Sequence, residues 1–341
     1  RKIMNSPFFS IIIPVYNGLS HDLSICLESI WQQPLSPSLY EVICVDDCST
    51  DDTREWLDEE ATKHSNLKII KHTVNKRQGG GRNTGIKAAH GRYIIFIDQD
   101  DYFHSGSIAK VYDHLQSVEL EILIVDCTYE RPGKVNNTLQ HNFPHHEVMT
   151  GDEQILRNSI PWAPWKFIFL RSLVVDNGLF FDEKERIEDI DWVHRLVHKA
   201  QRTQYQPILF IHYLKNDAST TMTSYKSVET MYSTLRCGMR LYQLTTSDFA
   251  QCGDEIKQSI QNIGEFVFGL GLRNFLTCKD DFLSKKQAIQ EIVLPYSERR
   301  FFLTKIAVAM PGAFSVLSNL MALFSPFLLE LRRKWKYSHL R

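Results

Sequence analysis

The chain lacks an excess of charge of either sign. Its 39 lysine and arginine residues nearly balance its 40 aspartate and glutamate residues, so the formal net charge is -1 at pH 7. Proteins that bind nucleic acid carry a basic surface that neutralises phosphate groups. The balance therefore argues against a nucleic-acid partner, and any electrostatic specialisation must be local.

Sequence signals for disulfide frameworks, zinc sites and secretion are also missing. The seven cysteines form no Cys-x-x-Cys pair and no regular set of spacings. The apolar run at 8–15 is short, contains Pro14 and precedes no small-residue cleavage site, unlike a signal peptide. We expect this run to be a buried strand and the protein to be cytoplasmic.

A repeated alternation of strands and helices is present instead. Runs that are apolar on both faces alternate with helical segments, which is typical of an α/β protein with a mostly parallel sheet covered on both sides. The length of 341 residues and the hydrophobic content of 43% suit such a core. The pattern predicts strands at 8–15, 40–45, 67–72 and 92–97, and helices at 23–31, 49–64 and 82–89.

Polar residues follow three of the expected strands. Tyr16 and Asn17 follow the first strand, Asp46 and Asp47 end the second, and residues 98–101 follow the fourth. In open parallel sheets, ligands bind beyond the carboxyl ends of the strands. We therefore expect these groups to line one cleft, although they lie far apart in the sequence.

Carboxylates crowd the end of the fourth strand, at Asp98, Asp100 and Asp101. Like charges repel, and the repulsion grows in a partly dry site. Carboxylate oxygens, together with substrate phosphates, are typical ligands of magnesium and manganese. The Asp98-Gln99-Asp100 triplet is therefore a candidate metal site that faces a diphosphate, and a solvated turn is the alternative.

Two further stretches could contact a nucleotide. Asp46 and Asp47 could accept hydrogen bonds from a ribose hydroxyl or a base N–H, or they could belong to a turn that caps the next helix. The glycines at 79–81 could bring Arg82 to phosphate oxygens, or they could form a flexible surface loop. No Gly-x-Gly-x-x-Gly fingerprint of dinucleotide binding follows the first strand.

Acidic residues open a later amphipathic helix, at Glu188, Asp189 and Asp191. The positive end of the helix dipole favours acidic side chains, which alone could explain them. The functional alternative is a general base that the same dipole keeps ionised.

Five segments, taken in order, resemble the successive signatures of family 2 glycosyltransferases with the GT-A fold. They are FFSIIIPVYN, EVICVDDCSTDDT, GRNTGIKAAHGRYIIFIDQDD, PWKFIFLRSLV and EDIDW, and the resemblance covers about residues 8–220. It implies an inverting enzyme that moves a sugar from a nucleotide donor, usually UDP-linked, to a hydroxyl group of an acceptor with Mg2+ or Mn2+.

The resemblance also implies roles on the donor side. Pro14, Tyr16 and Asp47 would border the uracil pocket, Asp98 would face the ribose, and Asp100 would bind the metal. Arg82, which matches the arginine of the family's Ala-Arg-Asn segment, would lie beside the diphosphate. The whole set expected to bind the nucleotide sugar is Pro14, Tyr16, Asn17, Asp46, Asp47, Arg82, Asn83, Asp98 and Gln99.

On the acceptor side, inversion requires a carboxylate that deprotonates the attacking hydroxyl group. Asp189 is the expected base, Asp191 is the alternative, and Glu188 would orient the acceptor. Looser matches to the family assign Trp165 and Lys166 to acceptor binding, His212 to the metal and Lys215 to the diphosphate.

The expected organisation is a GT-A catalytic domain at 1–224 followed by a helical region at 225–341. Residues 1–110 would bind the nucleotide sugar and residues 111–224 the acceptor. The segment 306–329 carries no charge and has basic residues on both sides. It could lie in the membrane interface, pack on the catalytic domain or cross a bilayer. The first alternative would place the protein peripherally at the inner face of the cell membrane.

The expected function is transfer of a sugar from a UDP-sugar to a saccharide or lipid-linked acceptor during synthesis of a cell-surface polysaccharide such as capsule, O-antigen or exopolysaccharide. The alternative is a non-catalytic scaffold that binds nucleotide sugars at the membrane. A nucleotidyltransferase is less consistent, because the stretch after the first strand, PVYNGLSHD, is not a glycine-rich basic loop.

Overall fold

The structure, a computed structural model, describes residues 6–131, 134–138, 147–157, 160–214, 227–277 and 291. The chain divides into two compact units, Arg1–Asn216 and Asp217–Arg341, which we describe separately. The expected domain boundary at residue 224 lies outside the described residues and stays a prediction.

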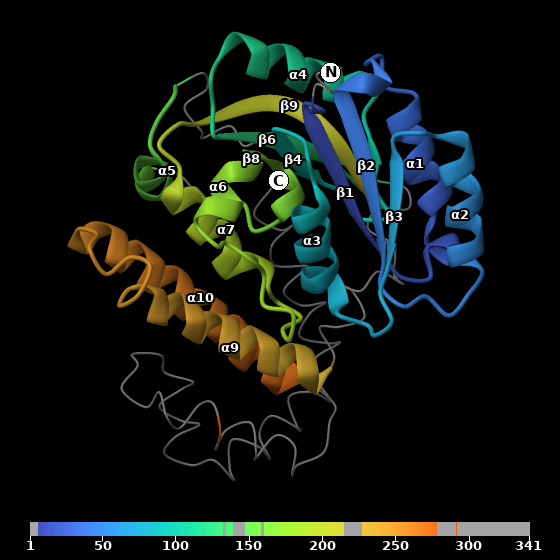
Figure 1. The fold of residues 1–341 in the computed structure, drawn as a ribbon. Helices are drawn as coiled ribbons and strands as arrows, with labels where there is room; N and C mark the ends of the chain where they lie inside the picture. The colour runs from blue at the N-terminus through green and yellow to red at the C-terminus, as the bar shows by residue number, and fades with distance from the viewer. Residues whose placement is uncertain are drawn as a thin grey trace. The chain divides into compact units, whose positions relative to one another are not determined.

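The first unit is built on one sheet (Figure 1), in the order β3-β2-β1-β4-β8-β6-β9-β5. The pairs β1–β2, β2–β3 and β1–β4 are parallel, as the sequence predicts. Every residue of β1 is buried, which explains its continuous apolar run. The four strands are β1 (Phe9–Val15), β2 (Tyr40–Asp46), β3 (Leu67–Lys71) and β4 (Tyr93–Phe96).

Helices cover both faces of these strands. In Figure 1, α1 and α2 lie on one side of β1–β3 and α3 lies on the other. Right-handed crossovers require this arrangement, because strand order runs outward from β1 to β3 and then returns to β4. The helices of this unit are α1 (Leu23–Trp31), α2 (Thr53–Lys63), α3 (Arg77–Ala88), α4 (Ser107–Ser117), α5 (Gly151–Arg157), α6 (Arg171–Asp176) and α7 (Asp189–Lys199).

Beyond β4 the sheet becomes mixed. The pairs β4–β8, β6–β8 and β5–β9 are antiparallel, whereas β6–β9 is parallel. The hairpin strand β7 pairs with β6. The sheet is thus mostly but not wholly parallel, and the α/β fold class is confirmed. These strands are β5 (Tyr102–Phe103), β6 (Ile122–Arg131), β7 (Lys134–Thr138), β8 (Phe167–Leu170) and β9 (Thr203–Leu214).

The helix α3 differs from its prediction. It begins at Arg77, so the glycines at 79–81 are buried inside its first turns and do not form a loop. Glycine is a poor helix former, which is why the sequence pattern predicted a later start. The missing side chains allow close packing: a Cβ atom on Gly85 would lie 2.3 Å from Cγ2 of Ile12 on β1.

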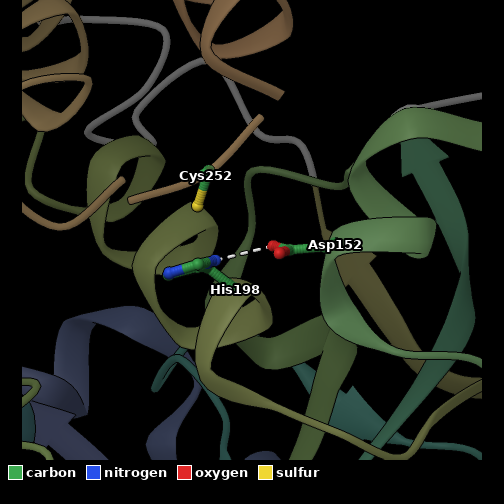
Figure 2. Close-up of side chains that lie close together, drawn as sticks. All are labelled: Asp152, His198 and Cys252. Atoms are coloured by element: carbon green, nitrogen blue, oxygen red, sulfur yellow. Dashed lines mark hydrogen bonds and ion pairs between the residues drawn. The ribbon is translucent and has the colours of Figure 1, made fainter. Parts of the chain in front are cut away.

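Aromatic packing fixes α7 against the sheet. The Trp192 ring stacks on Phe181 with centroids 4.1 Å apart and meets Phe96 edge-on at 6.0 Å. Its indole N–H donates a hydrogen bond of 2.9 Å to the Leu179 carbonyl. A second contact joins α7 to α5, where His198 Nδ1 and Asp152 Oδ1 are 2.6 Å apart (Figure 2). Contacts in the first and in the last turn therefore hold α7 in place.

The second unit is helical where it is described, as expected. Its helices are α9 (Val228–Leu244) and α10 (Asp254–Thr277). They cross closely at Gly238 and Gly264, because a Cβ on Gly238 would lie 2.8 Å from the Gly264 carbonyl oxygen. No helix in the described part of the chain is both long and apolar enough to span a bilayer. The segment 306–329 lies outside that part, so its three alternatives stay predictions.

Candidate active site

The loops after β1 and β4 are fastened together at the carboxyl edge of the sheet. The Gln99 amide oxygen accepts a 2.9 Å hydrogen bond from the Tyr16 N–H, and its amide nitrogen donates one of 2.9 Å to the Tyr16 carbonyl. The Tyr16 side chain stays 45% exposed. The structure thus brings together two of the expected nucleotide-binding residues, 83 positions apart.

Asn17 joins the loops after β1 and β2. Its backbone is left-handed, with φ of 50°, and its side-chain oxygen accepts a hydrogen bond of 2.8 Å from the Thr50 N–H. The Asn17 N–H donates to the Ser49 hydroxyl at 2.9 Å. Asp46 completes this turn: it accepts from the Ser49 N–H at 3.1 Å and pairs with Arg54. Both Asp46 oxygens therefore have protein partners.

Asp47 is oriented by groups from the segment between β3 and α3. One of its oxygens lies 2.7 Å from His72 Nδ1 and accepts a 2.7 Å hydrogen bond from the Lys76 N–H. His72 is held in turn by the Thr84 hydroxyl at 2.9 Å. The sequence analysis missed His72, although its position directly after β3, at the same edge of the sheet, could have indicated it.

Pro14 and Asn83 lie where α3 packs at the carboxyl edge of the sheet. Pro14 lies against Gly81, where a Cβ atom would approach within 3.0 Å of the proline Cβ. The Asn83 side chain donates to the Phe181 carbonyl at 2.9 Å and accepts from the Phe181 N–H at 2.9 Å. Asn83 therefore binds the segment that leads into α7.

Arg82 is buried and carries two ion pairs. Nη2 lies 2.9 Å from Asp98 Oδ1, and Nη1 lies 2.8 Å from Glu188 Oε1. The guanidinium carbon is 5.7 Å from the Phe96 ring centroid and 5.5 Å from that of Phe181. One arginine thus connects the end of β4 with the residue before α7.

The acidic triplet has the chemistry of a metal site. Burial and, next, the nearby Asp98 carboxylate raise the pKa of Asp100 to about 6. Among the described residues, no other side chain donates a hydrogen bond to Asp100. A hard divalent cation would relieve this repulsion, so the residues fit Mg2+ or Mn2+. Asp101 is more buried, and its Oδ1 accepts a 2.9 Å hydrogen bond from the Leu214 N–H.

Glu188 and Asp189 form a second acidic centre at the start of α7. Burial raises the pKa of Glu188 to about 8, with the Asp189 carboxylate as the next cause. Burial also raises the pKa of Asp189 to about 6, against the lowering effects of the Arg82 cation and the N–H groups of residues 189 and 190. A carboxyl group with a pKa near neutrality suits a general base. Asp191 lies in the same turn and is also buried.

The residues expected at the acceptor are buried. Trp165 stacks on Tyr213 with centroids 5.4 Å apart, and Lys166 Nζ lies 3.7 Å from Asp126 Oδ1. Both side chains are about 5% exposed or less. Their role in acceptor binding stays a prediction.

His212 lies on β9 opposite Tyr102 of β5. Its Nδ1 is paired with Glu130, and its ring stacks on His104 at 3.6 Å and on Tyr102 at 4.4 Å. It lines a cavity of about 340 Å³ between α1, β5 and β9. Its role as a metal ligand stays a prediction, and Lys215 lies outside the described residues.

Comparison with known proteins identifies the family. The model of glycosyl transferase family 2 matches residues 10–178. A poly(ribitol-phosphate) beta-glucosyltransferase of Bacillus spizizenii is 42% identical over 117 residues, which are 34% of this chain and only 18% of that protein. The match therefore spans less than a fifth of that relative.

Solved structures show the same fold. TarS 1–349 of Staphylococcus aureus, in complex with UDP-GlcNAc, superposes with a TM-score of 0.66 at 20% identity, covering 93% of this chain and 91% of that chain. The mannosyltransferase PcManGT of Pyrobaculum calidifontis, in complex with GDP-Man and Mn2+, gives a TM-score of 0.53 at 14% identity, covering 94% and 88%. The family match, with the GT-A architecture, places this chain in glycosyltransferase family 2.

Proposed function

We propose that this chain is an inverting glycosyltransferase that moves a sugar from a UDP-sugar to a hydroxyl group of a saccharide or lipid-linked acceptor in cell-surface polysaccharide synthesis. The observation that carries the proposal is the meeting of two acidic centres at one edge of the sheet. Asp98 belongs to the first and Glu188 to the second, and both pair with Arg82. Inverting transfer needs both a site for a nucleotide diphosphate and a base on the far side of the sugar.

The relatives support the donor and the setting. The Bacillus spizizenii relative is named for glucosyl transfer to poly(ribitol-phosphate), and the TarS structure contains UDP-GlcNAc. Both names fit a UDP-sugar donor and a polymeric cell-surface acceptor for this chain.

The uracil base would lie between the loops after β1 and β2. The half-exposed Tyr16 ring can stack on it, and Asp47 can accept a hydrogen bond from a base N–H. Pro14, which lies against Gly81 of α3, would border the base. Asn17, Asp46 and Gln99 would shape these loops through the hydrogen bonds described above.

Mg2+ or Mn2+ would bind at Asp100. When bound, the ion acts as a Lewis acid that neutralises the charge on the departing nucleotide diphosphate. Asp98 has one oxygen on Arg82, and its other oxygen would face the ribose. The Mn2+ in the PcManGT structure supports a divalent ion in this fold.

Asp189 would remove the proton from the acceptor hydroxyl as it attacks the anomeric carbon. The attack forms one bond while the sugar–phosphate bond breaks on the opposite face, so the configuration inverts. Glu188 would orient the acceptor, and Asp191 is the alternative base.

The test is to incubate the purified protein with UDP-glucose, UDP-GlcNAc, UDP-galactose and UDP-GalNAc in Mn2+ or Mg2+, and to follow UDP release with and without EDTA. We expect release from at least one donor and its loss with the chelator. Binding of a donor without release, whatever acceptor is supplied, would favour the scaffold alternative. Neither binding nor release from any donor would refute the proposal.

A further inference from the structure

Arg82 occupies an unusual place for a residue that is expected to bind phosphate. Its two terminal nitrogens contact carboxylates 16 and 106 positions away in the sequence, at 2.9 and 2.8 Å. Asp98 lies on the donor side of the proposed reaction, and Glu188 lies directly beside the proposed base. The guanidinium therefore lies between the two halves of the site.

Packing leaves this arginine little freedom. Its side chain is 3% exposed, and two aromatic rings flank the guanidinium. A phosphate-binding arginine that reaches toward a ligand would keep an accessible head group, whereas this one is enclosed on its faces and bound at both ends. Substituting a neutral side chain would leave the buried Glu188 and the partly buried Asp98 without this counterion.

The glycines of α3 let the segment before α7 and the strand β1 lie close to this helix. A Cβ atom on Gly79 would lie 3.2 Å from Glu188 Cγ and 3.2 Å from the Asp182 carbonyl oxygen, so the absence of a side chain lets the segment before α7 lie on the helix. Gly85 lets the same helix lie on β1. The segment that carries Glu188 thus lies on a helix that is itself fixed to the sheet.

We propose that Arg82 is a positioning residue that couples Asp98, at the donor, to Glu188 and the adjacent base Asp189. The inference rests on the proposed function and replaces simple diphosphate binding as the main role of this arginine. Rigid coupling holds the base at a fixed distance from the sugar, and a displacement of about 1 Å is expected to lower a transfer rate by about 100-fold.

Charge provides a second effect of the same contact. The charged groups that act on the Asp189 carboxylate are Asp191 of its own helix and the Arg82 cation of α3, and the adjacent Glu188 is coupled to it. The positive charge of Arg82 lowers the pKa of the Asp189 carboxyl group. Loss of the cation should therefore move the acid limb of the pH profile of transfer to higher pH.

The experiment compares Arg82→Met, which keeps an unbranched apolar stem and removes the charge, with Arg82→Lys, which keeps the charge but not the two-pronged contact. The matched control is Arg92→Met, because the Arg92 side chain is 51% exposed and lies outside the site. Each variant is measured for UDP affinity by calorimetry in Mn2+, for the transfer rate with the donor that the wild type uses, and for the pH dependence of that rate.

We expect Arg82→Met to lower the transfer rate by about 100-fold with a much smaller change in UDP affinity, and to shift the acid limb upward. Arg82→Lys should leave the limb near its wild-type position while recovering only part of the rate. Arg92→Met should match the wild type. In a double variant with Glu188→Gln, the loss should be smaller than the product of the two single losses, because both remove the same coupling.

Three results would overturn the inference. UDP affinity could fall as much as the rate in Arg82→Met, which would make Arg82 a phosphate ligand. The acid limb could stay in place in that variant. The losses in the double variant could multiply. If the wild type itself releases UDP from no donor, the proposed function fails and the inference fails with it, whereas a transferring wild type with any of these results overturns the inference alone.

Discussion

Asp189 experiences opposing influences that together set its acidity. Burial opposes its negative charge, whereas two N–H groups at the start of α7 and the Arg82 cation favour it. The result is a carboxyl group that is ionised at neutral pH and still basic enough to take a proton. Asp191 lies two residues further along the same turn, so it serves as the natural comparison.

Asp189→Asn should abolish transfer and spare donor binding. The amide keeps the shape of the side chain but cannot accept the acceptor proton, so we expect a rate loss of about 10²- to 10⁴-fold. Calorimetry with UDP and Mn2+ should give an affinity close to that of the wild type. Asp191→Asn tests the alternative base and should retain transfer. Normal transfer by Asp189→Asn together with loss in Asp191→Asn would reassign the base.

The pH profile should identify which acidic group titrates. At saturating Mn2+, transfer should fall about tenfold per pH unit as the pH drops below about 6, because a protonated Asp189 cannot act as the base. The sign follows from the raised pKa: the active ionised form is lost as the pH falls through it. An acid limb near pH 8 would instead indicate that Glu188 must be ionised.

At the scale of elements, α3 is the part that organises the site. It carries Arg82 and Asn83, its Thr84 holds His72, and its glycines set its distance from β1 and from the segment before α7. Changes in how this helix packs should therefore affect both stability and transfer.

Gly85→Ala should destabilise the protein although alanine is the better helix former. The new methyl group would lie 2.3 Å from Ile12 Cγ2, so α3 must move away from β1. Overpacking of about 1–3 kcal/mol should exceed the helical gain of about 1 kcal/mol. Urea unfolding should show a net loss in the free energy of unfolding. Lys87→Ala, on the exposed side of the same helix, should change it by about 0.5 kcal/mol or less. Equal or greater stability of Gly85→Ala would contradict this packing.

The strand pattern of the sequence predicts much of this arrangement. Parallel strands bring their ends to one edge, so Tyr16, Asp47 and Asp98 could be grouped from the sequence alone. The pairing of Arg82 with Glu188 could not, because nothing local specifies a contact across 106 positions. The start of α3 was also missed, since tertiary packing overrides the low helix propensity of three consecutive glycines.

On the scale of the whole molecule, the acidic site opposes folding. The carboxyl groups of Asp100, Asp189 and Glu188 have pKa values of about 6, about 6 and about 8, all above the value of about 4 expected in an unfolded chain. At pH values between about 4 and these pKa values, the three groups therefore bind more protons in the folded state than in the unfolded state. Without a metal ion, the contribution of these three groups to the free energy of unfolding should decrease as the pH rises from about 4 to about 8.

Asp100→Asn should raise the melting temperature in EDTA at pH 7.5. Removing this carboxylate removes the cost of burying its charge and its repulsion with Asp98. The free energy of unfolding should therefore rise by on the order of 1 kcal/mol after allowance for partial exposure. Mn2+ should raise the melting temperature of the wild type and have a much smaller effect on the variant. An equal Mn2+ effect on both proteins would show that the ion binds elsewhere. This measurement needs neither the donor sugar nor the acceptor.

The hydrogen bonds between Gln99 and the backbone of Tyr16 have a consequence for redesign. The middle residue of the Asp-x-Asp triplet is not a spacer, since both ends of its amide are bound to the loop that carries the exposed tyrosine ring. Replacing Gln99 with aspartate to strengthen cation binding would also release that ring. In the proposed mechanism, metal preference and nucleobase preference are therefore linked, and an attempt to tune one independently should begin at a position other than 99.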